Sequence, residues 1–100
     1  MYCVMRHYQG KSELAAELKK RGKDVEKAMT AVHGFLAYYL VEGGEGVTAV
    51  TICETNKGCE ESTRIAAEWL HKNVPNLKLP APRVATGQVA LAFDRSHAIA

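Results

Sequence analysis

The sequence predicts one α+β domain with the ferredoxin-like order βαββαβ, in which a four-stranded antiparallel sheet carries two helices on one face. The apolar pattern changes along the chain from strand to helix, then to two strands joined by a glycine-rich turn, then to helix and strand again. At 100 residues and 47% hydrophobic content, the chain is long enough for one core and too short for two domains. We therefore expect a single domain over residues 1–100, with a core of 1–93 and a tail of 94–100.

The first strand is predicted over residues 2–8, which are rich in strand-forming side chains. Strand alternation places Cys3, Met5 and His7 on one side and Tyr2, Val4, Arg6 and Tyr8 on the other.

A single amphipathic helix is predicted after the first strand. Apolar residues follow Leu14 at offsets of 4, 11, 15 and 18, which fall inside an arc of about 60° at 100° per residue. Gly22 interrupts this pattern at a cost of about 1 kcal/mol relative to alanine. The apolar phase continues across it, so we expect a kink and not two unrelated elements.

The middle of the chain predicts a hairpin. Residues 35–42 are apolar on both faces, which is typical of a central strand covered on both sides. The segment 43–46 contains three glycines and predicts the turn, and 47–54 predicts the returning strand.

The C-terminal half predicts a second helix and a fourth strand. Thr55 and Asn56 provide a cap, Trp69 lies on the inner stripe of the helix, and Pro75 ends it. After a proline-rich connection, residues 83–93 predict the last strand.

The sheet face opposite the helices requires a cover, because residues 35–41 place large apolar side chains on both faces. An exposed apolar sheet face usually marks an interface. The sequence therefore predicts a homodimer in which two sheets pack against each other with C₂ symmetry.

Charge and composition exclude several function classes. The formal charge of +2 is spread along the chain without a long basic run, so no nucleic-acid partner is expected. No segment approaches the roughly 18 apolar residues of a membrane span, and no signal sequence is indicated, so we expect a cytoplasmic protein. The histidines at 7, 33, 71 and 97 have no metal-binding spacing, so no metal site is expected.

Two local patterns carry a resemblance to a known family. His33-Gly34-Phe35 leads into Tyr38-Tyr39-Leu40, and the segment 62–69 reads STRIAAEW. With the element order, these patterns resemble the dimeric α+β barrel superfamily, specifically small proteins related to antibiotic biosynthesis monooxygenases. Pro often stands in the family where this chain has His33.

The resemblance implies a pocket between helices and sheet in which O₂ oxidises a flat aromatic or phenolic molecule with no cofactor. His7 and Tyr38 would then be the catalytic groups, and Tyr39, Trp69 and Phe35 would contact the substrate. Haem-degrading relatives use an Asn in the first strand with Trp and His on helices. The first strand here has no Asn, so the resemblance implies haem handling only through a different ligand arrangement.

Two function classes stay open from the sequence. One is a cofactor-independent monooxygenase, in which His7 acts as a base near neutral pH. The alternative is a non-enzymatic dimer that binds a small ligand or another protein, with His7 a satisfied polar residue and Trp69 a core anchor. An accessible cavity containing a buried polar group favours the enzyme, and a filled space favours the structural dimer.

Overall fold

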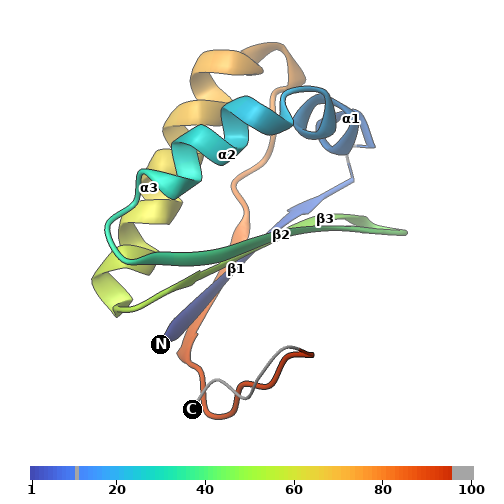
Figure 1. The fold of residues 1–100 in the computed structure, drawn as a ribbon. Helices are drawn as coiled ribbons and strands as arrows, with labels where there is room; N and C mark the ends of the chain where they lie inside the picture. The colour runs from blue at the N-terminus through green and yellow to red at the C-terminus, as the bar shows by residue number, and fades with distance from the viewer. Residues whose placement is uncertain (11, 96–100) are drawn as a thin grey trace.

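The computed structural model describes residues 1–10 and 12–95 and shows the helices stacked on one face of an antiparallel sheet (Figure 1). The strands lie in the order β2-β3-β1-β4, which is the ferredoxin-like arrangement, and the predicted fold class is confirmed. The elements in chain order are β1 (Tyr2–Gln9), α1 (Ser12–Lys20), α2 (Gly22–Thr30), β2 (Phe35–Gly43), β3 (Gly46–Cys53), α3 (Asn56–Asn73), the 3₁₀ turn η1 (Pro75–Leu77) and β4 (Arg83–Gln88).

The predicted long helix is two helices, α1 and α2, so the expectation of one continuous helix was wrong. Arg21 leaves helical geometry with φ −104° and ψ 29°, directly before Gly22, where the sequence predicted a weak point. Glycine lowers the cost of breaking the helix there. Leu14, Leu18 and Met29 are nevertheless all buried, so both helices pack their apolar stripes on the same side.

Strand β2 lies at the edge of the sheet, whereas the sequence predicted a central strand. Its apolar character has a different origin. Tyr38 and Leu40 pair with buried residues of β3 and face the helices, while Tyr39 and Val41 lie on the other face and are 58% and 52% exposed. The strand is therefore apolar on both faces, although the helices cover only one of them.

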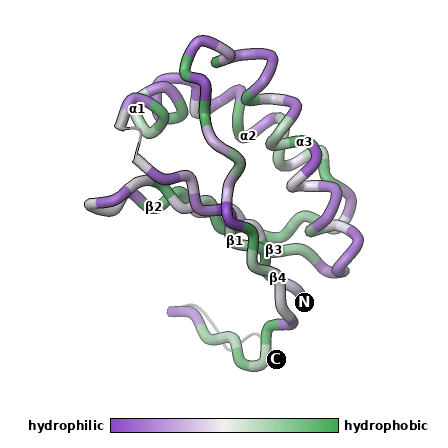
Figure 2. Tube along the Cα trace, turned by 180° about the vertical axis from the view of Figure 1, so that it is seen from behind, coloured by the Kyte–Doolittle hydropathy of each residue, from purple (hydrophilic) through white to green (hydrophobic). Residues whose placement is uncertain are grey.

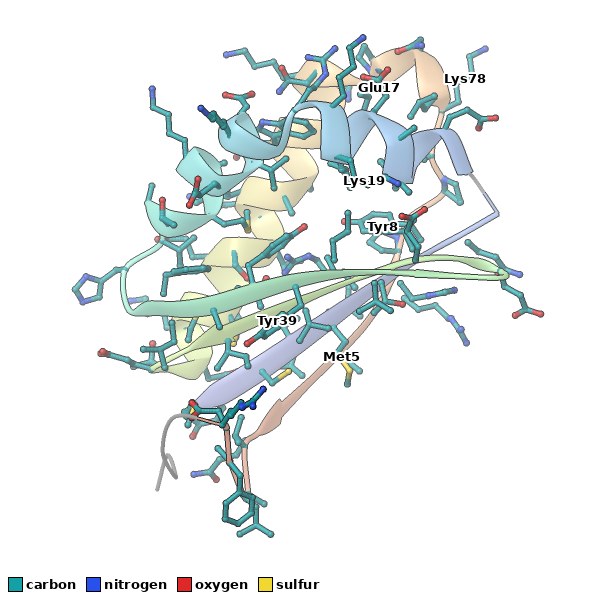
Figure 3. The ribbon with its side chains drawn as sticks, turned by 45° about the vertical axis from the view of Figure 1, so that its right-hand side comes forward. Met5, Tyr8, Glu17, Lys19, Tyr39 and Lys78 are labelled. Carbon is teal, nitrogen blue, oxygen red and sulfur yellow. The ribbon has the colours of Figure 1, made fainter. Side chains whose placement is uncertain are left out.

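The two faces of β1 follow the predicted alternation. Val4, Arg6 and Tyr8 are buried beneath the helices, and Met5 is 46% exposed on the opposite face. Figure 3 shows Tyr8 directed toward the helices, with Met5 and Tyr39 on the far side of the sheet. The face that carries Arg6 is therefore the core face.

Helix α3 begins as predicted. The Thr55 side chain accepts a hydrogen bond of 3.1 Å from the Gly58 amide, which caps the first turn. Trp69 and Leu70 contact the core from its inner side. None of the helices in the described ranges is both long and apolar enough to cross a membrane.

Strand β4 ends at Gln88, five residues earlier than predicted. Gln88 pairs with Tyr2, the first residue of β1, so no partner strand extends further. Beyond the strand, the Val89 amide donates to the Met1 carbonyl at 2.9 Å, and Phe93 forms an isolated β-bridge. The segment after β4 is largely hydrophobic in colour (Figure 2), and Leu91 and Phe93 are 77% and 76% exposed. Residues 96–100 of the predicted tail lie outside the described residues.

Candidate functional site

A small cavity lies between the sheet and helices α2 and α3. Its volume is about 30 Å³, which is room for about two water molecules. Arg6, Tyr8, Tyr38 and Trp69 contribute to its wall, and almost all of the surface that faces the cavity is apolar. The remaining lining residues are apolar: Leu18, Val25, Ala28, Met29, Ala49, Ala66 and Leu70.

Arg6 is the most buried charged residue at this site, with 1% of its surface exposed. Its Nη2 donates to Thr51 Oγ1 at 2.7 Å, and its Nη1 donates to Ser62 Oγ at 3.1 Å and to Thr63 Oγ1 at 3.3 Å. Nη2 also lies 4.0 Å from the Met29 sulfur. These contacts tie β1 to β3, α2 and α3, so the guanidinium is held in one position.

No salt bridge within the described residues neutralises the charge of Arg6. All its hydrogen-bond acceptors are neutral, and no carboxylate within residues 1–10 and 12–95 forms a salt bridge with it. Its Nε is buried and has no hydrogen-bond partner. Burial of an unpaired charge is costly, so this residue is unusual for a purely structural position.

Tyr8 and Tyr38 are the two tyrosines that line the cavity. Burial raises the pKa of both phenols above the ordinary value, and the nearby Arg6 guanidinium lowers the pKa by less than burial raises it. Both hydroxyls therefore stay protonated at neutral pH and act as hydrogen-bond donors or acceptors, not as bases.

Trp69 is fixed by a contact on the far side of its ring. The indole Nε1 donates to Asp24 Oδ2 at 3.0 Å, which links α3 to α2 above the cavity. The ring itself lines the cavity and packs against the cluster that contains Leu14 and Leu18. It is the only tryptophan of the chain, so its fluorescence reports directly on this site.

A larger hollow of about 570 Å³ lies beside the cavity, along the free edge of β2. The two spaces share Leu18, Val25, Met29 and Tyr38 as walls. At its rim the Lys19 Nζ and the Glu42 Oε1 form a salt bridge of 2.8 Å between α1 and β2. A volume of this size falls in the range of small-molecule sites.

The structure brings together only some of the residues that the sequence predicted. Tyr38 and Trp69 line the cavity, and Phe35 and Tyr39 line the outer hollow. His7 is not part of either space. It lies on the open face of the sheet, where its Nδ1 and Thr48 Oγ1 share a hydrogen bond of 2.9 Å, so it cannot reach a molecule in the cavity as a base.

Arg6 is the residue that sequence reasoning overlooked. The signal was present, since alternation placed a charged residue on the same side of β1 as Val4 and Tyr8. Alternation alone does not tell which side the helices cover, so the pattern did not mark Arg6 as buried.

The cysteines form no functional cluster with the cavity. All three are free thiols, and Cys53 and Cys59 are buried at the opposite end of the core, between β3 and the start of α3. No group of three or more metal-binding side chains occurs in the described part of the chain.

Cys53 makes stability depend on alkaline pH. Burial, then the neighbouring Cys59, raises its pKa from 9.0 to about 11. The thiol therefore stays protonated in the folded chain where it ionises in the unfolded chain. We expect the free energy of unfolding to fall as the pH rises from about 9 to about 11. Urea denaturation at both ends of this range measures the loss, which a Cys53→Ala variant should reduce; an unchanged slope in the variant would contradict the assignment.

No model of a known protein family matches the chain, and no curated protein is similar to it in sequence. Solved structures do match. The heme-degrader MhuD from Mycobacterium tuberculosis, with two hemes bound in its active site, has a TM-score of 0.68 and 20% identity, covering 94% of this chain and 100% of its own. A protein of unknown function from Nitrosomonas europaea has a TM-score of 0.67 and 15% identity, covering 94% of this chain and 93% of its own. SnoaB, a cofactor-independent oxygenase from Streptomyces nogalater, gives 0.60 and 12%, covering 94% and 96%.

The chain shares its ferredoxin-like α+β fold with these solved structures. The resemblance to antibiotic biosynthesis monooxygenase-like proteins is thereby confirmed at the level of the fold. Identities of 12–20% in these three comparisons carry the backbone arrangement and not the roles of single residues. The chemistry of this protein must therefore be argued from its own cavity.

Proposed function

We propose that the protein binds an aromatic small molecule in the cavity and the adjoining hollow and oxidises it with O₂ without a resident cofactor. The observation that carries the proposal is the cavity itself. It combines an indole ring, two protonated phenols and a buried cation with otherwise apolar walls. The fold shared with a cofactor-independent oxygenase supports the same reaction class.

The reaction needs no reductant when the substrate supplies all four electrons. An aryl CH₂ group activated by a ring hydroxyl loses protons, and the resulting anion reduces O₂. The CH₂ group becomes C=O, and the second oxygen atom leaves as water. The protein then has to hold the anion, admit O₂ and exclude bulk water.

Each residue's role in the proposed reaction follows from its position in the site. Trp69 offers a flat face to the substrate ring, and the Tyr8 and Tyr38 hydroxyls donate hydrogen bonds to oxygen atoms that gain charge. Phe35 lies further out, in the hollow, where it contacts the part of the substrate that the cavity is too small to hold. Tyr39 borders the hollow only at the edge of β2, because its side chain lies on the opposite face of the sheet.

Filling the cavity tests this proposal. Ala66 lines it, whereas its neighbour Ala67 is exposed and lies outside its lining. With a panel of phenols and naphthols that carry an aryl CH₂ group, we expect Ala66→Leu to lower O₂ uptake by about tenfold or more. Ala67→Leu is the matched control and should leave the rate unchanged. Uptake no faster than the uncatalysed reaction for every panel member, or equal rates in both variants, would refute the proposal.

A non-enzymatic ligand-binding role is the second candidate. It is favoured by the chemistry of the cavity wall, since none of its described lining residues is a carboxylate or an imidazole that could act as a base. Saturable quenching of Trp69 fluorescence by panel members without any O₂ uptake would select this role.

We also propose that two copies pair through the sheet face opposite the helices. Met5, Tyr39 and Val41 lie exposed there, and each is 46% exposed or more. The segment that follows β4 runs on the side of the sheet away from the helices (Figure 1), and it contains the exposed residues Leu91 and Phe93. A contiguous apolar surface of this kind favours self-association.

A further inference from the structure

Arg6 requires a counter-ion that the described chain does not provide. The guanidinium is 1% exposed, its partners Thr51, Ser62 and Thr63 are neutral hydroxyls, and its Nε has no partner. Burying a cation without an anion has a high desolvation cost. A negatively charged ligand that pairs with the cation offsets this cost, so the site favours anion binding.

The ionisable neighbours of Arg6 do not fill this role. These are the phenols of Tyr8 and Tyr38 and the thiol of Cys53, and burial raises the pKa of all three. Each is therefore neutral at pH 7. None of the described ionisable neighbours therefore supplies an anion at this place.

The space next to Arg6 sets the size of the charged group. The cavity of about 30 Å³ accommodates an oxygen atom and its nearest neighbours, but not an aromatic ring system. The hollow of about 570 Å³, which shares the walls Leu18, Val25, Met29 and Tyr38, has room for the rings. This arrangement suits a ligand whose charged oxygen points inward while its body lies along the edge of β2.

We propose that Arg6 is the anion-binding residue of this site and that it selects aromatic ligands in their phenolate form. The guanidinium stays protonated, the phenol O–H bond breaks, and the proton passes to solvent water. The cavity then needs no base of its own, because the cation lowers the pKa of the bound phenol. The assignment rests on the proposed function only in treating this ligand as the substrate; anion binding is measurable without turnover.

The first test uses 4-nitrophenol, whose phenolate absorbs visible light and whose neutral form does not. With wild-type protein in excess, a pH titration of absorbance gives the pKa of the bound molecule. We expect it to lie about one unit or more below that of free 4-nitrophenol, so that the phenolate binds about tenfold more tightly than the phenol. The neutral ether 4-nitroanisole should bind weakly and should not compete.

Variants assign the effect to one residue. Arg6→Met should abolish the pKa shift, whereas Arg6→Lys should keep part of it because the charge remains. Arg64→Met is the matched control, since it removes an exposed arginine of α3 and should leave the shift unchanged. If Arg6→Met does not fold, the wild-type titration and the Arg6→Lys variant still test whether Arg6 causes the pKa shift.

The outcomes separate this assignment from the oxidation chemistry. An Arg6-dependent shift without O₂ uptake supports the anion site and counts against the monooxygenase. Oxidation of phenols with no preference for the phenolate overturns the anion site and leaves the monooxygenase standing. A bound pKa equal to or above the free value, or the absence of any binding, also overturns the anion site.

Discussion

Gly46→Ala is expected to lower the free energy of unfolding by about 3 kcal/mol or more. Gly46 opens β3 with φ +146°, a backbone conformation that L side chains rarely adopt. A Cβ atom at this position would lie 2.2 Å from the carbonyl oxygen of Tyr8 on the neighbouring strand. The clash is with backbone, so the strand pair itself must separate. Urea denaturation followed by circular dichroism measures the loss.

Gly44 is the matched control in the same hairpin. A Cβ atom there meets nothing within 4 Å, so Gly44→Ala should change stability by no more than about 0.5 kcal/mol. Equal stability of both variants would show that β1 and β3 do not approach as closely as described. Since Tyr8 both borders Gly46 and lines the cavity, Gly46→Ala should also weaken 4-nitrophenolate binding.

The element order could be predicted because local patterns determine it. Strand alternation in β1, the capped start of α3 and the glycine-rich turn before Gly46 all depend on neighbours in sequence. The sequence predicted the position of the break between α1 and α2, at Gly22. It did not predict that the two segments separate into distinct helices. Whether a helix kinks or separates depends on packing against the sheet, which no local pattern contains.

The position of β2 and the end of β4 depend on long-range pairing. An apolar pattern on both faces is typical of a central strand, but β2 is an edge strand with one face under the helices and the other open. Residues 89–93 have strand-like composition, yet β1 begins at Tyr2 and offers them no ladder. Composition predicts the preference for a strand, and only the partner strand decides where it ends.

The candidate site shows the same division. Tyr38 and Trp69 were predicted from the resemblance and from the inner stripe of a helix, and both line the cavity. His7 was predicted because histidine is a common general base in enzymes, but it lies on the face opposite the helices. Arg6 was one position away on the covered face. A charged residue that alternates with apolar residues on one face of a strand indicates a buried charge, and Arg6 is such a residue.

Met5→Glu is expected to convert the proposed dimer to a monomer at micromolar concentration. Met5 lies in the middle of β1, an inner strand, and its side chain faces away from the helices (Figure 3). In a C₂ pair the substitution buries two carboxylates in an apolar interface. The penalty of several kcal/mol corresponds to a rise in the dimer Kd of about 100-fold or more. Sedimentation equilibrium of wild type and variant measures it.

Ala67→Glu is the control for the added charge, because Ala67 is exposed on the helical side of the molecule and should leave the association unchanged. A wild-type protein that is monomeric at high micromolar concentration, or a Met5→Glu variant that stays dimeric, would refute pairing through this face. The described cavity lining comes from one chain and lies on the other side of the sheet from Met5. A monomeric Met5→Glu variant should therefore still bind 4-nitrophenolate within a few-fold of wild type. Loss of binding together with dissociation would instead mean that the second copy holds the sheet, and with it Arg6, in the geometry that anion binding requires.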